Sequence, residues 1–331
     1  MIGWYVHHHG AGHRQRLLAV SRHLRTPVTA LSSVRPPAGF AGEWIRLARD
    51  DDGSVDRASA NAGGALHWAP LHHPGLQDRS AAVASWIARA RPSLFVTDVS
   101  VEVTALARLC GVPVVVFAML GDRDDPPHRL GRTLATALVA PWPAPQAHEP
   151  RPAPGAPVVH VGAFSRFDGR PATAGPPRPG TVLVLFGRGG RDVGEDDFRA
   201  ARVATPGWTW EYRVPGSTTT TGDDDVWTAL QRAEVVVVHG GHNAVAEVAA
   251  ARRPAVVIAQ DRPFGEQRRR AELLRAEGLV ALDSWPASPA DWPGLLAAAR
   301  AAGAGPWERW APGDGAQRAA AFLDDAAGST R

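Results

Sequence analysis

The stretch that decides the fold is EVVVVHGGHNAVAE, residues 234–247. Its run of valines predicts a buried strand of a parallel sheet, and the alanine-rich segment after the glycines predicts a helix. Gly240 and Gly241 let a ligand approach the backbone closely, while the N–H groups and the dipole at a helix N-terminus favour an anion. The stretch therefore predicts an anion site, with phosphate as the expected ligand, where a strand turns into a helix.

The predicted helix carries two polar residues, Asn243 and Glu247, one turn apart on the same face. The Glu247 carboxylate could accept two hydroxyl hydrogen bonds from a ribose. A structural interpretation stays open, in which Asn243 caps the helix, Glu247 is solvated and His239 is a satisfied strand-end histidine. A capping box, however, would place its acid at Ala246, three residues after the cap, which weakens the structural account of Glu247.

Short β-branched runs alternate with longer Ala-, Leu- and Arg-rich segments along the chain, a pattern typical of parallel sheets with helices on both faces. We predict strands near 1–6, 27–31, 93–97, 113–117, 181–186, 208–214, 234–238 and 255–259. We predict helices near 13–25, 77–91, 101–110, 195–204, 225–232, 243–251, 265–277 and 315–327. Residues 35–75 are ambiguous. The predicted class is α/β throughout.

Proline-rich sequence interrupts this alternation at 141–157 and again, with glycine, at 169–180. A length of 331 residues suits two domains, and the boundary is expected in this region. Two successive parallel-sheet domains suggest a ligand in the cleft between them, outside the carboxyl ends of the strands.

The composition, 44% hydrophobic and 21% charged with a mean hydropathy of −0.17, is typical of a globular protein and not of a disordered or collagen-like chain. The apolar runs fall far short of the ~20 residues of a membrane span. The N-terminus has no signal-peptide pattern, so we expect a cytoplasmic protein. With 36 basic and 33 acidic residues, nucleic acid is not the expected partner.

Several other features favour structural interpretations and no metal. The adjacent histidines His7–His9 would point to opposite faces of a strand. Cys110 is interpreted as a small buried filler, and the Arg268–Arg270 run as an exposed helix face. Three aspartate clusters, at 50–52, 122–125 and 223–225, are interpreted as solvated turns. We therefore expect neither a metal site nor a cofactor.

The segment from His239 to Glu247 resembles the nucleotide-sugar signature of GT-B glycosyltransferases, H-x-G-x-N-[ST]-x-x-E, at every spacing from His to Glu. The likeness continues through Pro254, an apolar strand, and Glu266-Gln267 at the start of a helix. It is to the peptidoglycan N-acetylglucosaminyltransferase, with its family 28 C-terminal domain, and to bacterial and plant family 1 enzymes. The resemblance implies a GT-B fold, with two Rossmann-like domains facing a central cleft.

On this basis residues 1–163 form an N-terminal acceptor-side domain and residues 164–314 a C-terminal nucleotide-sugar-binding domain. Residues 315–331 form a C-terminal helix, for which packing back on the N-terminal domain is one option. The resemblance implies that His239, Gly241 and Asn243 face the diphosphate. It assigns the ribose hydroxyls to Glu247 and the donor sugar to Glu266 and Gln267. The full predicted donor-binding set is Gly187, Arg188, Gly189, His239, Gly240, Gly241, His242, Asn243, Glu247, Glu266 and Gln267.

Gly187 and Gly189 enter that set because glycines after the strand 181–186 suit the close approach of a diphosphate or an acceptor. Arg188 between them is either a phosphate clamp or a solvated loop residue. Two positions depart from the family pattern. Ala244 stands where a Ser or Thr hydroxyl usually meets a phosphate, and Arg252 stands where a glycine is usual.

A second strand–glycine–helix pattern lies at the N-terminus, with Gly10, Gly12 and His13 before an apolar-periodic helix. A tight strand-to-helix turn would explain it structurally, but GT-B enzymes resemble it in position, with Arg16 here in place of their usual proline. Asp98 follows the strand 93–97. It is either a helix cap or a functional residue, acting as a second candidate base or as an orienter of His13. The predicted catalytic residues are His13 and Asp98.

The resemblance implies an inverting, metal-independent glycosyltransferase of bacterial type. Its partners would be a nucleotide-sugar donor, with UDP expected from the resemblance, and an acceptor that the sequence does not identify. Weak peripheral membrane attachment has little support from the small net charge, and the oligomeric state stays open. The twelve tryptophans could line an aromatic acceptor pocket. The alternatives are a nucleotide-sugar epimerase or hydrolase on the same fold, and a non-catalytic nucleotide-sugar-binding protein.

Overall fold

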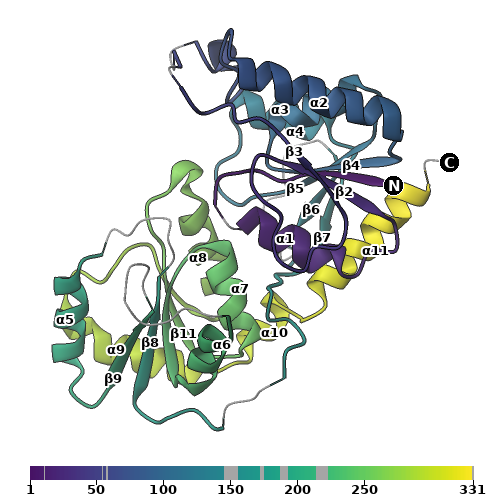
Figure 1. Cartoon of the computed structure of the whole chain (residues 1–331). Coiled ribbons are helices and arrows are strands. Elements are labelled where there is room, and N and C mark those ends of the chain that lie inside the picture. The colour runs from purple at the N-terminus through teal and green to yellow at the C-terminus, as the bar shows by residue number, and fades with distance from the viewer. Residues whose placement is uncertain are drawn as a thin grey trace. The chain divides into compact units, whose positions relative to one another are not determined.

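Two parallel sheets, each covered by helices, organise the chain in a computed structural model (Figure 1). The structure describes residues 1–10, 12–53, 55–56, 59–144, 156–171, 175–186, 193–213 and 223–329, with side chains of the last range from 226 onward. The first unit comprises residues 1–119, 123–161 and 315–331, and the second comprises residues 120–122 and 162–314.

The sheet of the first unit has the strand order β3-β2-β1-β4-β5-β6-β7, and all its pairs are parallel. Its strands are β1 (Ile2–Tyr5), β2 (Val28–Ser32), β3 (Glu43–Arg46), β4 (Leu94–Asp98), β5 (Val114–Phe117), β6 (Ala137–Ala140) and β7 (Val158–His160). The helices are α1 (Gly12–Ser21), α2 (Pro74–Ala90), α3 (Val101–Leu109), α4 (Pro126–Leu134) and α11 (Gly315–Gly328), with a 3₁₀ turn at Ala62–Gly64. In Figure 1, α1 and α11 lie on one side of the sheet and α2, α3 and α4 on the other.

Close packing around β1 fixes this sheet. A Cβ atom on Gly3 would lie 2.6 Å from the Trp86 ring, so a side chain at this strand position would displace the core. Because the strand order reverses direction between β1 and β4, the carboxyl ends of these two neighbours form the topological switch point, where ligands bind in open α/β sheets.

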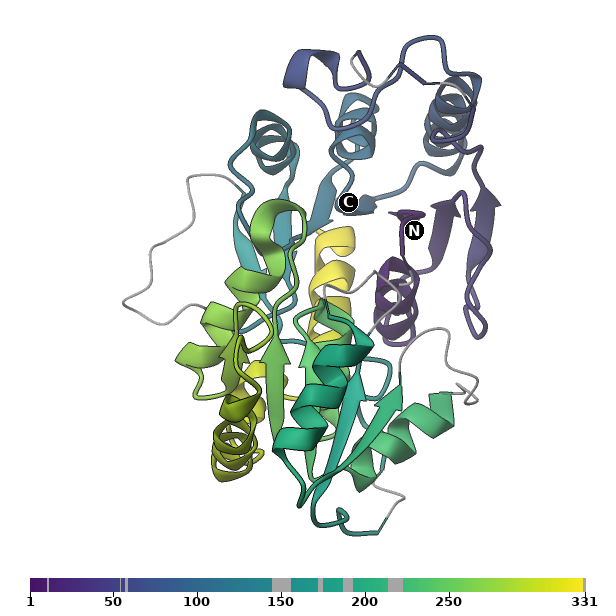
Figure 2. The same cartoon turned by 90° about the vertical axis from the view of Figure 1, so that its left-hand side faces the viewer.

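The sheet of the second unit has the order β12-β11-β10-β8-β9, again with parallel pairs. Its strands are β8 (Thr181–Leu185), β9 (Thr209–Arg213), β10 (Val235–His239), β11 (Ala255–Ile258) and β12 (Val280–Leu282). Its helices are α5 (Glu195–Ala204), α6 (Asp223–Arg232), α7 (His242–Ala250), α8 (Glu266–Ala276), α9 (Trp292–Ala302) and α10 (Pro306–Trp310), with 3₁₀ turns at Pro263–Gly265 and Pro289–Asp291. Figure 2 shows these strands side by side. The switch point of this sheet lies between β10 and β8.

The last helix, α11, belongs to the first unit and is tied to the end of α1. The Asp324 carboxylate accepts hydrogen bonds from the backbone N–H groups of Arg25 at 3.0 Å and Thr26 at 2.9 Å. Burial alone would raise the pKa of Asp324, but these hydrogen bonds hold it below its usual range. The ionised carboxylate therefore holds the turn after α1 against the end of the chain.

The predicted strands and helices all occur in the structure, with boundaries shifted by a few residues. The sequence patterns missed β3, β6, β7, β12, α4, α9 and α10, of which the strands have only three or four residues. One packing prediction is wrong: Cys110 is exposed, because it caps the C-terminus of α3 outside the helix's apolar face. Within the described residues, no helix combines the length and the apolar character needed to cross a membrane.

Candidate functional site

The first unit brings His13 and Asp98 together at the switch point of its sheet. Tyr5 and Thr97 are register partners on β1 and β4, so the loop after β1 and the end of β4 lie next to each other. His13 Nδ1 lies 2.9 Å from Asp98 Oδ2, and the Asp98 side chain is fully buried whereas 15% of the His13 side chain is exposed. With Nδ1 toward the carboxylate, Nε2 is the nitrogen through which His13 would meet a substrate.

Asp98 is not a helix cap. Ser100 occupies the N-cap position of α3, and its hydroxyl accepts the hydrogen bond of the Val103 N–H group. The structural alternative for Asp98 is therefore wrong, since a different residue performs the capping.

Arg16 is a third member of this group that the sequence patterns did not single out for a role. Its guanidinium Nη1 donates to Asp98 Oδ1, and its side chain is 5% exposed. It also lies over the Phe117 ring, 5.3 Å from the centroid. Burial alone would raise the pKa of Asp98, but Arg16 and then His13 outweigh it and hold that pKa well below its usual range. The carboxylate is thus ionised at neutral pH.

The histidine run before His13 lies in a loop, because β1 ends at Tyr5. The argument against a metal at His7–His9 assumed that these residues alternate along a strand, and it is therefore wrong. The His7 ring lies 5.5 Å from the His13 ring, centroid to centroid. Burial lowers the pKa of His7 to about 3, with His13 and His8 contributing further, so His7 is neutral at pH 7.

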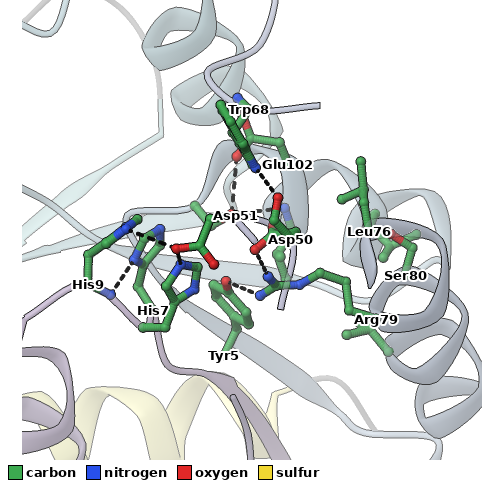
Figure 3. A pocket seen from close by; sticks show the side chains of 15 residues that line it. Tyr5, His7, His9, Asp50, Asp51, Trp68, Leu76, Arg79, Ser80 and Glu102 are labelled. Atoms are coloured by element: carbon green, nitrogen blue, oxygen red, sulfur yellow. Dashed lines mark hydrogen bonds and ion pairs between the residues drawn. The ribbon is translucent and has the colours of Figure 1, made fainter. Parts of the chain in front are cut away.

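A cavity of about 410 Å³ opens beside this run, lined by β1, α2, α3 and the loops between them (Figure 3). Arg79 is one of the lining residues: its side chain is 4% exposed, donates to the Tyr5 hydroxyl at 2.6 Å and pairs with the Asp50 carboxylate. Asp50 is itself buried, so the prediction of a solvated turn is wrong there, because Arg79 reaches back from α2 to neutralise it. Trp68 also lines the cavity.

Most tryptophans are packed in the interior, as large aromatic residues usually are. Buried positions are held by Trp4, Trp86, Trp210, Trp227, Trp292, Trp307 and Trp310. Trp68 is held at the cavity by its indole N–H group, which donates to the Asp50 carbonyl at 2.8 Å. Of the tryptophans that could line an aromatic acceptor pocket, Trp68 is thus the one described residue that lines this cavity.

In the second unit the loop after β10 makes a tight turn at His239. The Gly241 N–H group donates to His239 Nδ1 at 3.0 Å, and a Cβ atom on Gly241 would lie 2.3 Å from His239 Cε1. The Gly240 N–H group donates to the Ile258 carbonyl at 2.8 Å. Two of the backbone N–H groups that the sequence offered to an anion are thus already bonded, that of Gly241 within the turn and that of Gly240 to the neighbouring strand β11, and Gly241 serves the close packing of the turn.

His239 is neutral. Burial lowers its pKa to about 4, with Arg262 and Arg270 contributing further. Because Nδ1 accepts a hydrogen bond, the proton of the neutral ring resides on Nε2. The ring is therefore a hydrogen-bond donor at the end of β10.

Helix α7 begins at His242 with Gly241 as its N-cap, and no side chain caps it. The capping interpretation of Asn243 is wrong, since this residue is already in the first turn of the helix. The N–H groups of that turn and the helix dipole favour an anion at this end.

Glu247 lies one turn further along α7 and is not solvated. Its side chain is 14% exposed, and its Oε1 lies 2.9 Å from Arg166 Nε. Arg166 also stacks over the Phe167 ring, 4.6 Å from the centroid. The solvated interpretation of Glu247 is therefore wrong, and Arg166 is a partner that no sequence pattern indicated.

Glu266 and Gln267 open α8, as predicted. Gln267 is buried and accepts a hydrogen bond from the Gln260 N–H group through Oε1 at 3.0 Å, so it supports the loop after β11. The prediction of an exposed 268–270 run is wrong for Arg270, which is 2% exposed and donates to the Gly240 carbonyl. Arg270 follows Gln267 by three residues and shares its inward face.

The remaining predicted positions are placed as follows. Gly10 has a φ of +80°, which glycine adopts without strain, and Gly12 begins α1. Gly187, Arg188 and Gly189 lie outside the described residues.

The folds of both units and these turns define an α/β protein with the GT-B fold of glycosyltransferases. Residues 215–282 match the family profile described as the glycosyltransferase family 28 C-terminal domain. Three similar structures cover nearly the whole chain at low sequence identity. The glycotransferase of kitacinnamycin has 16% identity and a TM-score of 0.69, with 98% of each chain covered. MurG of Acinetobacter baumannii has 14% identity and a TM-score of 0.63, covering 98% of this chain and 99% of that one.

The third is a UDP-glucosyltransferase from Polygonum tinctorium capable of glucosylating indoxyl. It has 15% identity and a TM-score of 0.67, with 99% of this chain and 98% of that chain covered. A search of curated protein sequences gives no match. The predicted resemblance and fold class are confirmed, and the enzyme class of the matched domain and structures is the predicted one, glycosyltransferase.

Proposed function

We propose that this chain transfers a sugar, with inversion, from a nucleoside-diphosphate sugar to an acceptor hydroxyl, with UDP as the expected nucleotide. The observation that carries this proposal is the His13–Asp98 pair, an imidazole held at 2.9 Å by a buried, ionised carboxylate. Such a pair is the arrangement that a general base needs.

His13 is the proposed base. The Asp98 carboxylate is proposed to accept a hydrogen bond from the His13 Nδ1–H group and so to direct the Nε2 lone pair toward the acceptor hydroxyl. As His13 takes the hydroxyl proton, the same carboxylate stabilises the imidazolium. Arg16 keeps Asp98 ionised and fixed in place, which supports the orienting role.

The donor diphosphate is proposed to bind at the N-terminus of α7. The neutral His239 offers its Nε2 proton, and the first helical turn offers N–H groups and a positive dipole end. These groups stabilise the charge that develops on the leaving diphosphate without a metal ion on the phosphates. Glu247, already oriented by Arg166, is proposed to accept hydrogen bonds from the ribose hydroxyls.

The acceptor is proposed to enter the cavity of the first unit. Tyr5 and His7 line this cavity, and they lie shortly before α1, whose first turn carries His13. Its volume of about 410 Å³ suits a small molecule, and its lining of carboxylates, imidazoles and aromatic rings favours an acceptor with both polar and apolar parts.

The proposal is tested in two stages. A thermal-shift screen of nucleoside diphosphates and their sugar esters should show stabilisation by one nucleotide, worth about 2.7 kcal/mol at 100-fold excess over its Kd. Incubation of that sugar ester with a panel of small hydroxylated acceptors, followed by NMR, should then show a product of inverted anomeric configuration. Epimerised or hydrolysed donor without acceptor, or saturable binding with no turnover on any acceptor, would contradict glycosyl transfer.

A further inference from the structure

Three side chains at one end of the cavity in the first unit converge on a point between them. His8 Nε2 lies 3.2 Å and His9 Nε2 lies 3.5 Å from the same oxygen, Asp51 Oδ2. The three ligand atoms lie within 4.8 Å of one another. Figure 3 shows the His9 ring facing the Asp51 carboxylate at the cavity.

The two nitrogen–oxygen separations, 3.2 and 3.5 Å, are those of ligands on one metal ion. Atoms about 2.1 Å from a tetrahedral zinc ion lie about 3.4 Å from each other. Imidazole nitrogens with a carboxylate oxygen form a ligand set that suits zinc and neighbouring divalent transition metals, and not calcium or magnesium.

The buried polar atoms of this group point independently to a ligand. The His8 side chain is 5% exposed; its Nε2 has the ion-pair contact with Asp51 Oδ2, and its Nδ1 has no hydrogen-bond partner among the described residues. Asp51 Oδ1 is likewise buried without a hydrogen bond. Buried nitrogen and oxygen atoms normally have partners, so these atoms call for one. Arg49, which is half exposed, lies 2.6 Å from Asp51 Oδ2 and can remain as a hydrogen-bond donor to a bound carboxylate.

We propose that His8, His9 and Asp51 bind one divalent transition-metal ion of the zinc class. All three residues line the cavity, so the remaining coordination position faces it and can take an oxygen atom of the molecule bound there. The site lies within the first unit and is separate from the proposed binding of the donor diphosphate.

The chain offers a matched control in a second His-His-Asp group, formed by His67, Asp125 and His128. The ring nitrogens of His128 are differently engaged, because Nδ1 lies 2.8 Å from Asp125 and Nε2 lies 3.0 Å from Arg123 Nη1. The Arg123 guanidinium donates to His128 Nε2, so the lone pair that this nitrogen would offer to a metal is already engaged. The two groups have the same residue types and differ in their surroundings.

The test is equilibrium dialysis of the chelator-treated full chain against Zn²⁺, with the absorption spectrum of the Co²⁺ form as a second readout. We expect one tight equivalent in the wild type, with affinity reduced at least tenfold in His9→Ala and in Asp51→Asn and unchanged in His67→Ala. His9 has a side chain that is 69% exposed, so its removal should leave the fold intact even if Asp51→Asn does not.

Three results would overturn the proposal. The wild type could bind Zn²⁺ no more tightly than His9→Ala does, His67→Ala could lose Zn²⁺ binding, or the Co²⁺ spectrum of His9→Ala could equal that of the wild type. None of these readouts depends on a donor or on transfer activity. The metal site and the proposed function can therefore fail separately.

Discussion

The turn after β1 and the turn after β10 occupy equivalent places in their sheets, but their electrostatics are opposite. Each follows a central parallel strand at a switch point and leads through glycine into a helix. The first is built on charge, with the ionised Asp98 between His13 and Arg16. The second is built on a neutral, half-buried His239 that bonds to the backbone of its own turn. The same topology thus supports the proposed proton acceptor in one unit and a neutral hydrogen-bond donor in the other.

The largest expected effect concerns the charged turn. Replacing the proposed base by His13→Ala should lower kcat by about 10²- to 10⁴-fold, because general base catalysis contributes that much. The measurement is steady-state kinetics with the donor found in the thermal-shift screen. His23→Ala, at an exposed position just after α1, is the matched control and should keep kcat. An unchanged kcat in His13→Ala would remove His13 from the base role.

In the second unit, Glu247→Ala should weaken binding of the nucleoside diphosphate by about 1.5 to 3 kcal/mol, the value of a charge-assisted hydrogen bond. Calorimetric titration measures it, with Glu272→Ala as control, since Glu272 is half exposed on α8 and pairs with Arg269. Equal affinities of the two variants would mean that Glu247 serves only its contact with Arg166.

The packing of the neutral turn predicts an effect on stability. Gly241→Ala would place a methyl group 2.3 Å from the His239 ring, so the ring must move or the turn must open. We expect a loss of about 1 to 3 kcal/mol in the free energy of unfolding, the usual cost of overpacking. Gly207→Ala, where an added Cβ meets no atom within 4 Å, is the control. Urea denaturation that shows no difference between the two variants would refute a tightly packed turn.

The smallest expected effect concerns the pH dependence of the neutral turn at His239. Folded His239 has a pKa of about 4, below the value of about 6.5 in the unfolded chain, so the unfolded state takes up a proton first as pH falls. Its contribution to stability is therefore lost between about pH 6.5 and pH 4. The usual pKa of an aspartate, 3.8, is already below this window, and that of Asp98 is lower still. Protonation of Asp98 therefore does not change the free energy of unfolding between about pH 7 and pH 5.

Between pH 7 and pH 5 the wild type should lose on the order of 1 kcal/mol more stability than His239→Asn, whose amide oxygen can still accept the Gly241 hydrogen bond. Urea denaturation at the two pH values measures this difference. A larger loss in the variant than in the wild type would reverse the assigned protonation state.

Much of the fold was predictable, because buried parallel strands and amphipathic helices leave strong periodic patterns. The valine run before His239 and the glycines after it identified β10 and the start of α7. Short strands such as β3 at 43–46 were not predictable, since four residues of mixed polarity carry no clear period.

The candidate site was predictable only where its residues follow strands. His13 and Asp98 end up paired because β1 and β4 are neighbours, which strand patterns make plausible. The burial of Arg16, Arg79 and Arg270 was not predictable, because an arginine in a helix looks the same in sequence whether it faces water or a buried carbonyl or carboxylate.

By itself the sequence determined the strand–glycine–helix order of each unit and the types of residue placed at the ends of the strands. These follow from local backbone preferences and from the periodicity of apolar side chains. Only the tertiary structure decided which backbone N–H groups bond inside the turn at His239, which partner holds Glu247, and that His8, His9 and Asp51 converge. Contacts of this kind join residues far apart in the chain or fix the rotation of a ring, and they depend on how neighbouring elements exclude water around each charge.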